Sequence, residues 1–123
     1  MTNEFDAFLL EQFAPLGDIR IKRMFGGLGV FKGELMFALV AYDVLHFKAD
    51  ETTIPAFEAE GCGPFVYEGK GRTVTMSYWK APERLFDEPD EFRQWAADAY
   101  AVALRASAGK QKKPKGARPG KAG

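Results

Sequence analysis

Two reactive side chains, His46 and Cys62, are each the only one of their kind in this chain of 123 residues. An imidazole placed beside a thiol can activate it as a nucleophile by lowering the thiol pKa and taking its proton. The sequence does not predict that contact, because His46 alternates with Leu45 and Phe47 in a strand-like run while Cys62 lies between two glycines. A strand histidine and a structural thiol are therefore the favoured interpretations.

A dense set of carboxylates precedes the last helix-like segment. Paired carboxylates can hold a metal ion or exchange protons in catalysis. These also lie where a helix N-terminus stabilises negative charge, so capping explains most of them. No phosphate-loop, EF-hand, zinc-protease or hydrolase motif accompanies them, and we predict no enzyme activity and no catalytic, cofactor-binding or metal-binding residue. The carboxylates are Glu83, Asp87, Glu88, Asp90 and Glu91.

Cations give the clearest candidate for a binding surface. Arg20, Lys22 and Arg23 lie in one strand-like run, in which Ile19 and Ile21 alternate with the first two cations. Such a patch can meet an acidic partner or phosphates, and it can equally serve as a solvated sheet edge. We take these three cations as the candidate partner-binding residues.

The elements that must position these residues follow from the spacing of apolar side chains. Helical spacing predicts a first helix from about residue 3 to 13, a short second helix between Thr52 and Gly61, and a last helix after Asp87. Alternation predicts a meander of strands over residues 19–48 and a hairpin over residues 65–79. The expected fold is α+β, with about five antiparallel strands and helices packed mainly on one face.

Three glycines, Gly26, Gly27 and Gly29, interrupt the first strand-like region. Glycine tolerates unusual backbone conformations and close backbone approach. A phosphate-binding loop is the competing interpretation, but such loops open a helix, whereas these glycines join two strand-like runs. We therefore predict a structural bend.

Composition divides the chain into a folded body and a tail. Residues 109–123 hold six cations and no anion, which leaves the first 108 residues with 11 cations and 17 anions. The tail lacks large apolar residues, so we expect one domain over residues 1–107 and a disordered basic tail over residues 108–123. A single cysteine, an acidic N-terminus and no long apolar run favour a cytoplasmic protein outside the membrane.

The order of several short motifs resembles the N-terminal domain of the TfoX/Sxy family of bacterial competence regulators, over roughly residues 5 to 105. The resemblance implies an α+β fold of the secretion-chaperone-like kind, and it brings no catalytic residues. It depends on the motif residues Met24, Phe25, Gly26, Gly27, Gly29, Phe65, Tyr67, Tyr78, Trp79 and Trp95, to which we assign structural roles.

The resemblance implies a non-enzymatic regulatory domain that binds another protein, with the transcription machinery as the expected source of that partner. Family members carry a second, C-terminal domain, in whose place this chain has a short basic tail. The alternative is a nucleic-acid-binding accessory protein, which uses the basic strand patch together with weak, non-specific contacts of the tail. A small-molecule binder with an aromatic pocket between sheet and helices is a third interpretation.

Overall fold

The structure, a computed structural model, describes residues 4–24, 27–69 and 71–112, and its α+β arrangement confirms the expected fold class. Six strands are present where about five were expected. The strands are β1 (Ile19–Met24), β2 (Gly27–Lys32), β3 (Leu35–Ala41), β4 (Val44–Lys48), β5 (Pro64–Gly69) and β6 (Arg72–Lys80). The helices are α1 (Glu4–Phe13), α2 (Ile54–Ala59) and α3 (Pro89–Lys112), with the 3-10 turns η1 (Ala14–Leu16) and η2 (Glu83–Asp87).

All six strands form one antiparallel sheet in the order β1-β2-β3-β4-β6-β5. The first four strands are the predicted meander. The β5–β6 hairpin joins it through β6, which pairs with β4 by placing Lys80 beside His46 and Tyr78 beside Lys48. This late pairing brings residues from the two halves of the sequence onto one surface.

The β3–β4 connection is a two-residue turn with an unusual sequence. Tyr42 and Asp43 both have positive φ values, 54° and 61°. A two-residue hairpin favours that backbone conformation because its twist matches the twist of the flanking strands. The Tyr42 side chain is almost fully exposed at the tip of the turn.

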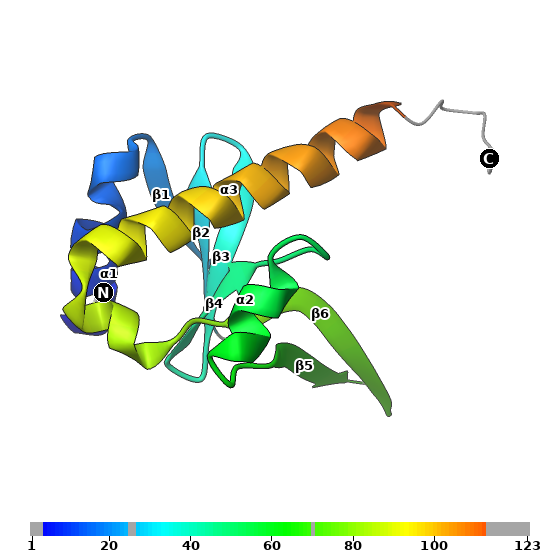
Figure 1. Ribbon diagram of the computed structural model, residues 1–123. Helices are drawn as coiled ribbons and strands as arrows, with labels where there is room; N and C mark the ends of the chain where they lie inside the picture. The colour runs from blue at the N-terminus through cyan, green and yellow to red at the C-terminus, as the bar shows by residue number, and fades with distance from the viewer. Residues whose placement is uncertain (1–3, 25–26, 70, 113–123) are drawn as a thin grey trace.

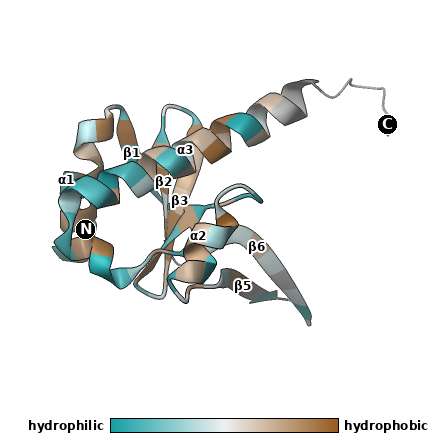
Figure 2. Ribbon diagram, in the orientation of Figure 1, coloured by the Kyte–Doolittle hydropathy of each residue, from teal (hydrophilic) through white to brown (hydrophobic). Residues whose placement is uncertain are grey.

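The helices gather on one face of the sheet, where α3 crosses the strands and α1 lies beside its N-terminal turns (Figure 1). Phe13 of α1 lies at the centre of the core, with its ring near those of Phe37, Phe47 and Phe92. All four side chains are fully buried. Apolar residues colour much of β2 and β3, whereas hydrophilic stretches are prominent on α3 (Figure 2).

A bulge in the β2–β3 pairing determines which residues of β3 face the core. Val30 pairs with Ala38 and Phe31 pairs with Met36, so Phe37 has no counterpart on β2. Such a bulge lets two consecutive residues turn to the same side. Phe37 and Ala38 both join the core, and the next residue, Leu39, lies on the opposite face.

The short helix α2 packs against aromatic residues of the last strand, β6, and the last helix, α3. The ring of Phe57 lies 4.9 Å from that of Trp95 and 6.1 Å from that of Trp79. Phe57 is buried, so these contacts fix α2 over the β6 side of the sheet. The two tryptophans, Trp79 and Trp95, are therefore partly buried and pack against the core.

Gly27 has a specific steric reason to be glycine. A Cβ atom added there would lie 2.0 Å from the carbonyl oxygen of Val40 on β3. The position therefore requires close backbone approach rather than a positive φ value. Gly26 and Phe25, the other central residues of this motif, lie outside the described residues.

Helix α3 continues to Lys112, and its last turns run past the edge of the sheet (Figure 1). Residues 108–112 therefore belong to this helix, whereas residues 113–123 of the expected tail lie outside the described part of the chain. Among the described helices, none combines the length and apolar character needed to span a membrane.

Candidate partner-binding surface

The described helices lie on one side of the sheet, and we call the opposite side, which no described helix covers, the uncovered face (Figure 1). Cross-strand pairing places five of its residues in a row that crosses the sheet from β1 to β6. The row runs Lys22, Gly29, Leu39, His46 and Lys80. Cross-strand partners share a face because side chains alternate along each strand. The row therefore begins and ends with a cation.

A second set of residues on this face repeats the arrangement. Arg20 of β1 pairs with Phe31 of β2, which pairs with Met36 of β3. Farther across the sheet on this same face, Lys48 of β4 pairs with Tyr78 of β6. Two cations from β1 and two from β4 and β6 thus flank a mostly apolar centre.

Charge is distributed unevenly between the sheet and the helical layer. The six strands contain seven cations and one carboxylate, Glu68, which lies in the β5–β6 hairpin opposite Thr73. The helices and 3-10 turns contain nine carboxylates and five cations within the described residues. The described part of the molecule is therefore basic on its sheet and acidic over its helices.

Two of the flanking cations, Arg20 and Lys48, each make a hydrogen bond and lie over an aromatic ring. Arg20 donates to the carbonyl oxygen of Gly33 at 2.8 Å and lies over the Phe31 ring. Lys48 donates to the Ser77 hydroxyl and lies over the Tyr78 ring.

Lys80 lies 3.6 Å from an exposed carboxylate of Glu83, a spacing at which a surface ion pair contributes little. Lys22 is exposed and has no carboxylate within ion-pair distance among the described residues. Within the described residues, the charge of Lys22 is therefore uncompensated and that of Lys80 only weakly compensated.

The apolar centre of the face is stabilised by contacts that span strands. Tyr78 of β6 donates its hydroxyl to the carbonyl oxygen of Met36 on β3, across β4, at 3.3 Å. The ring of Phe65 on β5 lies 5.0 Å from that of His46, across β6. Leu39, His46 and Tyr78 are buried by such contacts without a helix over them. Burial also raises the pKa of Tyr78 to about 12, so its hydroxyl stays protonated.

His46 lies at the middle of this face as a buried, neutral group. Burial lowers its pKa, nearby backbone groups of Val44 and Leu39 oppose the shift in part, and the positive charge of Lys80 lowers it further. Its Nδ1 atom has no hydrogen-bond partner among the described residues. A buried polar atom without a hydrogen-bond partner lowers the stability of the fold, so burial of the His46 ring carries an energetic cost.

Sequence reasoning located one side of this surface. Arg20 and Lys22 share the uncovered face, whereas alternation places Arg23 on the side of Ile19 and Ile21, which pack against the core. Lys48 and Lys80 escaped that reasoning because they join the surface through the β4–β6 pairing. The available signal was the shared alternation of His46 with Lys48 and of Tyr78 with Lys80, but nothing in the sequence gave their register.

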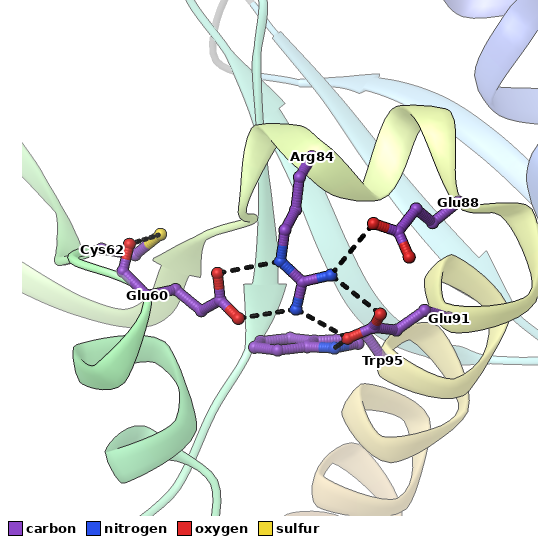
Figure 3. Close-up of polar contacts among 6 residues, drawn as sticks. All are labelled: Glu60, Cys62, Arg84, Glu88, Glu91 and Trp95. Carbon is purple, nitrogen blue, oxygen red and sulfur yellow. Dashed lines mark hydrogen bonds and ion pairs between the residues drawn. The ribbon is translucent and has the colours of Figure 1, made fainter.

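The second charged region, which we call the Arg84 cluster, lies in the helical layer (Figure 3). Arg84 of η2 makes paired hydrogen bonds to the carboxylates of Glu60 and Glu91, with distances between 2.6 and 3.1 Å. Glu88 lies 3.5 Å away, and the Trp95 indole donates to Glu91 at 3.2 Å. The cluster joins the end of α2 to the start of α3.

The protonation states of the Arg84 cluster follow from these contacts. Hydrogen bonds from Arg84 lower the pKa of Glu91 to about 2 and also lower that of Glu60. The same contacts raise the pKa of Arg84. Glu60 and Glu91 thus stay charged and face the same guanidinium. These acids serve to bind Arg84, a role that the capping interpretation of Glu88 and Glu91 did not anticipate.

The structure provides no thiol–imidazole pair from His46 and Cys62. Cys62 packs against the core on the helical side, while His46 belongs to the uncovered face. Burial raises the pKa of the Cys62 thiol, which disfavours the nucleophilic thiolate. Among the described residues, no three histidine, cysteine or carboxylate side chains are grouped so as to hold a metal ion.

These observations define a small α+β domain with an acidic helical layer and a basic, partly apolar sheet face. The chain belongs to the TfoX N-terminal domain family, whose model matches residues 11–103. This competence-related family is the one that the short motifs indicated. The motif residues Phe65 and Tyr78 lie on the uncovered face, and Trp79 and Trp95 pack on the helical side.

One curated relative is the DNA transformation protein TfoX1 of Aliivibrio fischeri. It is 31% identical to this chain over 74 residues, which make up 60% of the chain and 35% of the relative. The matched region therefore spans about a third of the length of that relative.

Proposed function

We propose that this chain is a regulatory domain without catalytic activity that acts by binding another protein through its uncovered face. The observation that carries the proposal is the pair of cationic flanks around an apolar centre, on a sheet side that no described helix covers. Buried apolar centres with polar rims are typical of protein interfaces. The cationic flanks favour a partner whose contacting surface is acidic.

The family and its relative supply the setting for this binding. The relative is named for DNA transformation, which supports a role in the control of DNA uptake, exerted in the cytoplasm on a component of the transcription machinery. The uncovered face is the part of this domain best suited to such a contact, since Arg84, Glu60 and Glu91 of the cluster are already bonded to one another.

Site-specific photocrosslinking tests this proposal. A photoreactive amino acid replaces Met36 on the uncovered face or, as a control, the exposed Asp98 on α3, and the adducts formed in the native host are treated with nuclease. We expect a discrete protein adduct from position 36 and none from position 98. A protein adduct from position 98 alone, or no nuclease-resistant adduct at all, contradicts the proposal.

A second candidate function is nucleic-acid binding by the same cations, favoured by the excess of cations over carboxylates in the sheet. Contacts of this kind are directed at phosphates, so binding should be general across sequences and steeply weakened by salt. Fluorescence anisotropy with duplex DNA at two salt concentrations, on the full chain and on a form ending at Ser107, distinguishes binding by the body from binding by residues 108–123. Salt-resistant binding by the shorter form favours this second function over a protein partner.

A further inference from the structure

We propose that the uncovered face receives an acidic amphipathic helix of the partner protein, lying along β2 and β3 between the two cationic flanks. This inference rests on the proposed function and names the chemistry of the partner at the same surface. It goes beyond a general preference for acidic proteins, because the distance between the two cationic flanks fits a partner segment with the width of one α-helix.

The width of the face fits a single helix. The cations of β1 and those of β4 lie three strands apart, which corresponds to about 14 Å at the usual strand spacing. A helix with its side chains is about 10–12 Å in diameter. A helix seated over β2 and β3 would therefore have Arg20 and Lys22 along one side and Lys48 along the other.

The floor between the flanks suits the apolar stripe of such a helix. Gly29 has no side chain, and its neighbours across the pairing are Lys22 and Leu39. Phe31 and Met36 are half-buried on the same face without a described helix over them. Gly29 itself is buried, so the surface that a docking helix can still cover comes from Phe31 and Met36.

A partner strand cannot add to the sheet at this place. β2, β3 and β4 each pair with a strand on both sides, so their backbone groups are already used within the sheet. A partner can therefore contact the centre of the uncovered face only through side chains. An amphipathic helix presents apolar side chains on one side and acids along both margins of that stripe.

The helices of a second copy of this chain carry acids but no exposed apolar stripe among the described residues, because α1 and α3 each expose one large apolar side chain, Leu10 and Leu104. Glu91 of α3 is bound to Arg84, and Asp90 of α3 is paired with Arg93. The apolar residues Leu9 and Phe13 of α1 are fully buried in the core. The occupant is accordingly a helix from a different protein.

A selection experiment tests the chemistry of the occupant without knowledge of its identity. A display library of random 16-residue peptides is panned on the immobilised full chain, and enriched peptides are synthesised and measured by fluorescence anisotropy. We expect enrichment of Asp and Glu flanking apolar residues spaced three and four apart. A proline placed in the middle of an enriched peptide should abolish its binding.

Two matched variants locate the binding. Arg20→Glu with Lys22→Glu should weaken the enriched peptide about tenfold or more, since it replaces two attractive charges by repulsive ones. Arg72→Glu with Arg93→Glu, which changes the total charge equally at an exposed and a half-buried position outside the two flanks, should leave affinity unchanged. Circular dichroism confirms that both variants are folded.

Several outcomes overturn the inference. They are enrichment of basic or strictly alternating peptides, no enrichment over the bare support, tolerance of the central proline, and equal binding by both variants. Self-association of the free chain that is lost in the Arg20→Glu and Lys22→Glu variant would assign the face to a second copy. If photocrosslinking from position 36 still traps a protein while the library fails, the proposed function stands and the helical partner is wrong.

Discussion

The Arg84 cluster and the uncovered face differ in the contacts that their charged side chains make. In the cluster one guanidinium meets three carboxylates, and the contacts join η2, α3 and the end of α2. On the uncovered face Arg20 and Lys22 flank apolar side chains on one side and make no ion pair among the described residues, and Lys80 on the other side pairs with the exposed carboxylate of Glu83. The comparison teaches that charged side chains bonded to one another across elements hold those elements together, whereas exposed charges such as that of Lys22 stay available to a partner.

The largest expected effect comes from a residue that shapes the sheet itself. Gly27→Val should destabilise the fold by about 1–3 kcal/mol, because any Cβ atom collides with the Val40 carbonyl and the strands must shift. Chemical denaturation of this variant beside Gly63→Val, where a Cβ meets no atom within 4 Å, measures the difference. An unchanged denaturation midpoint for Gly27→Val would show that the close approach of β2 and β3 does not constrain this position.

The comparison predicts stability effects of different size for cations of the two regions. Arg84→Met removes the common partner of Glu60 and Glu91 and leaves their charges facing each other, so the melting temperature should fall by a few degrees. Lys22→Met removes an exposed charge of the uncovered face and should leave the melting temperature nearly unchanged. If both variants lower the melting temperature equally, the charged contacts of the two regions do not differ in their contribution to stability.

Acid should weaken the Arg84 cluster in a defined range of pH. The pKa of Glu91 is lowered from 4.5 to about 2 by its contacts with Arg84, so its contribution is complete above about pH 4.5. It is lost as the pH falls through about 2, where the folded protein also takes up the proton. The stability difference between the wild type and Arg84→Met, followed by denaturation from pH 6 down to pH 2, should therefore shrink in this range. A constant difference would mean that Glu91 does not depend on Arg84.

His46 gives the uncovered face a smaller pH dependence at milder acidity. Its pKa is lowered in the folded protein, so below about pH 6.5 the unfolded chain takes up a proton first and stability falls. Each unit between the two pKa values contributes about 1.4 kcal/mol. His46→Gln should lack this decline between pH 7 and pH 5 in the same denaturation series. A parallel decline in both proteins would assign the effect to other groups.

The sequence predicted the meander, the hairpin and the helices because alternation and helical spacing are local properties. It placed Arg20 and Lys22 on a common face for the same reason. It missed Lys48 and Lys80 because their position depends on β6 pairing with β4, across the intervening α2 and β5. It also gave capping as the reason for Glu88 and Glu91, since the contact with Arg84 depends on how η2 packs against α3.

The bulge at Phe37 shows a further limit. Strict alternation along β3 would place Phe37 and Leu39 on one side, yet Phe37 packs in the core and Leu39 faces away from it. Where the extra residue falls depends on the pairing of β2 with β3, which the local pattern does not contain.

The most direct test of the account is the yield of the protein adduct from position 36 in two charge variants. Arg20→Glu with Lys22→Glu should abolish the adduct while the free energy of unfolding changes by no more than about 0.5 kcal/mol, as is usual for exposed substitutions. Arg72→Glu with Arg93→Glu should retain the adduct at the wild-type yield. An undiminished adduct in the folded Arg20→Glu and Lys22→Glu variant would contradict the claim that the uncompensated cations of this sheet face bind the partner.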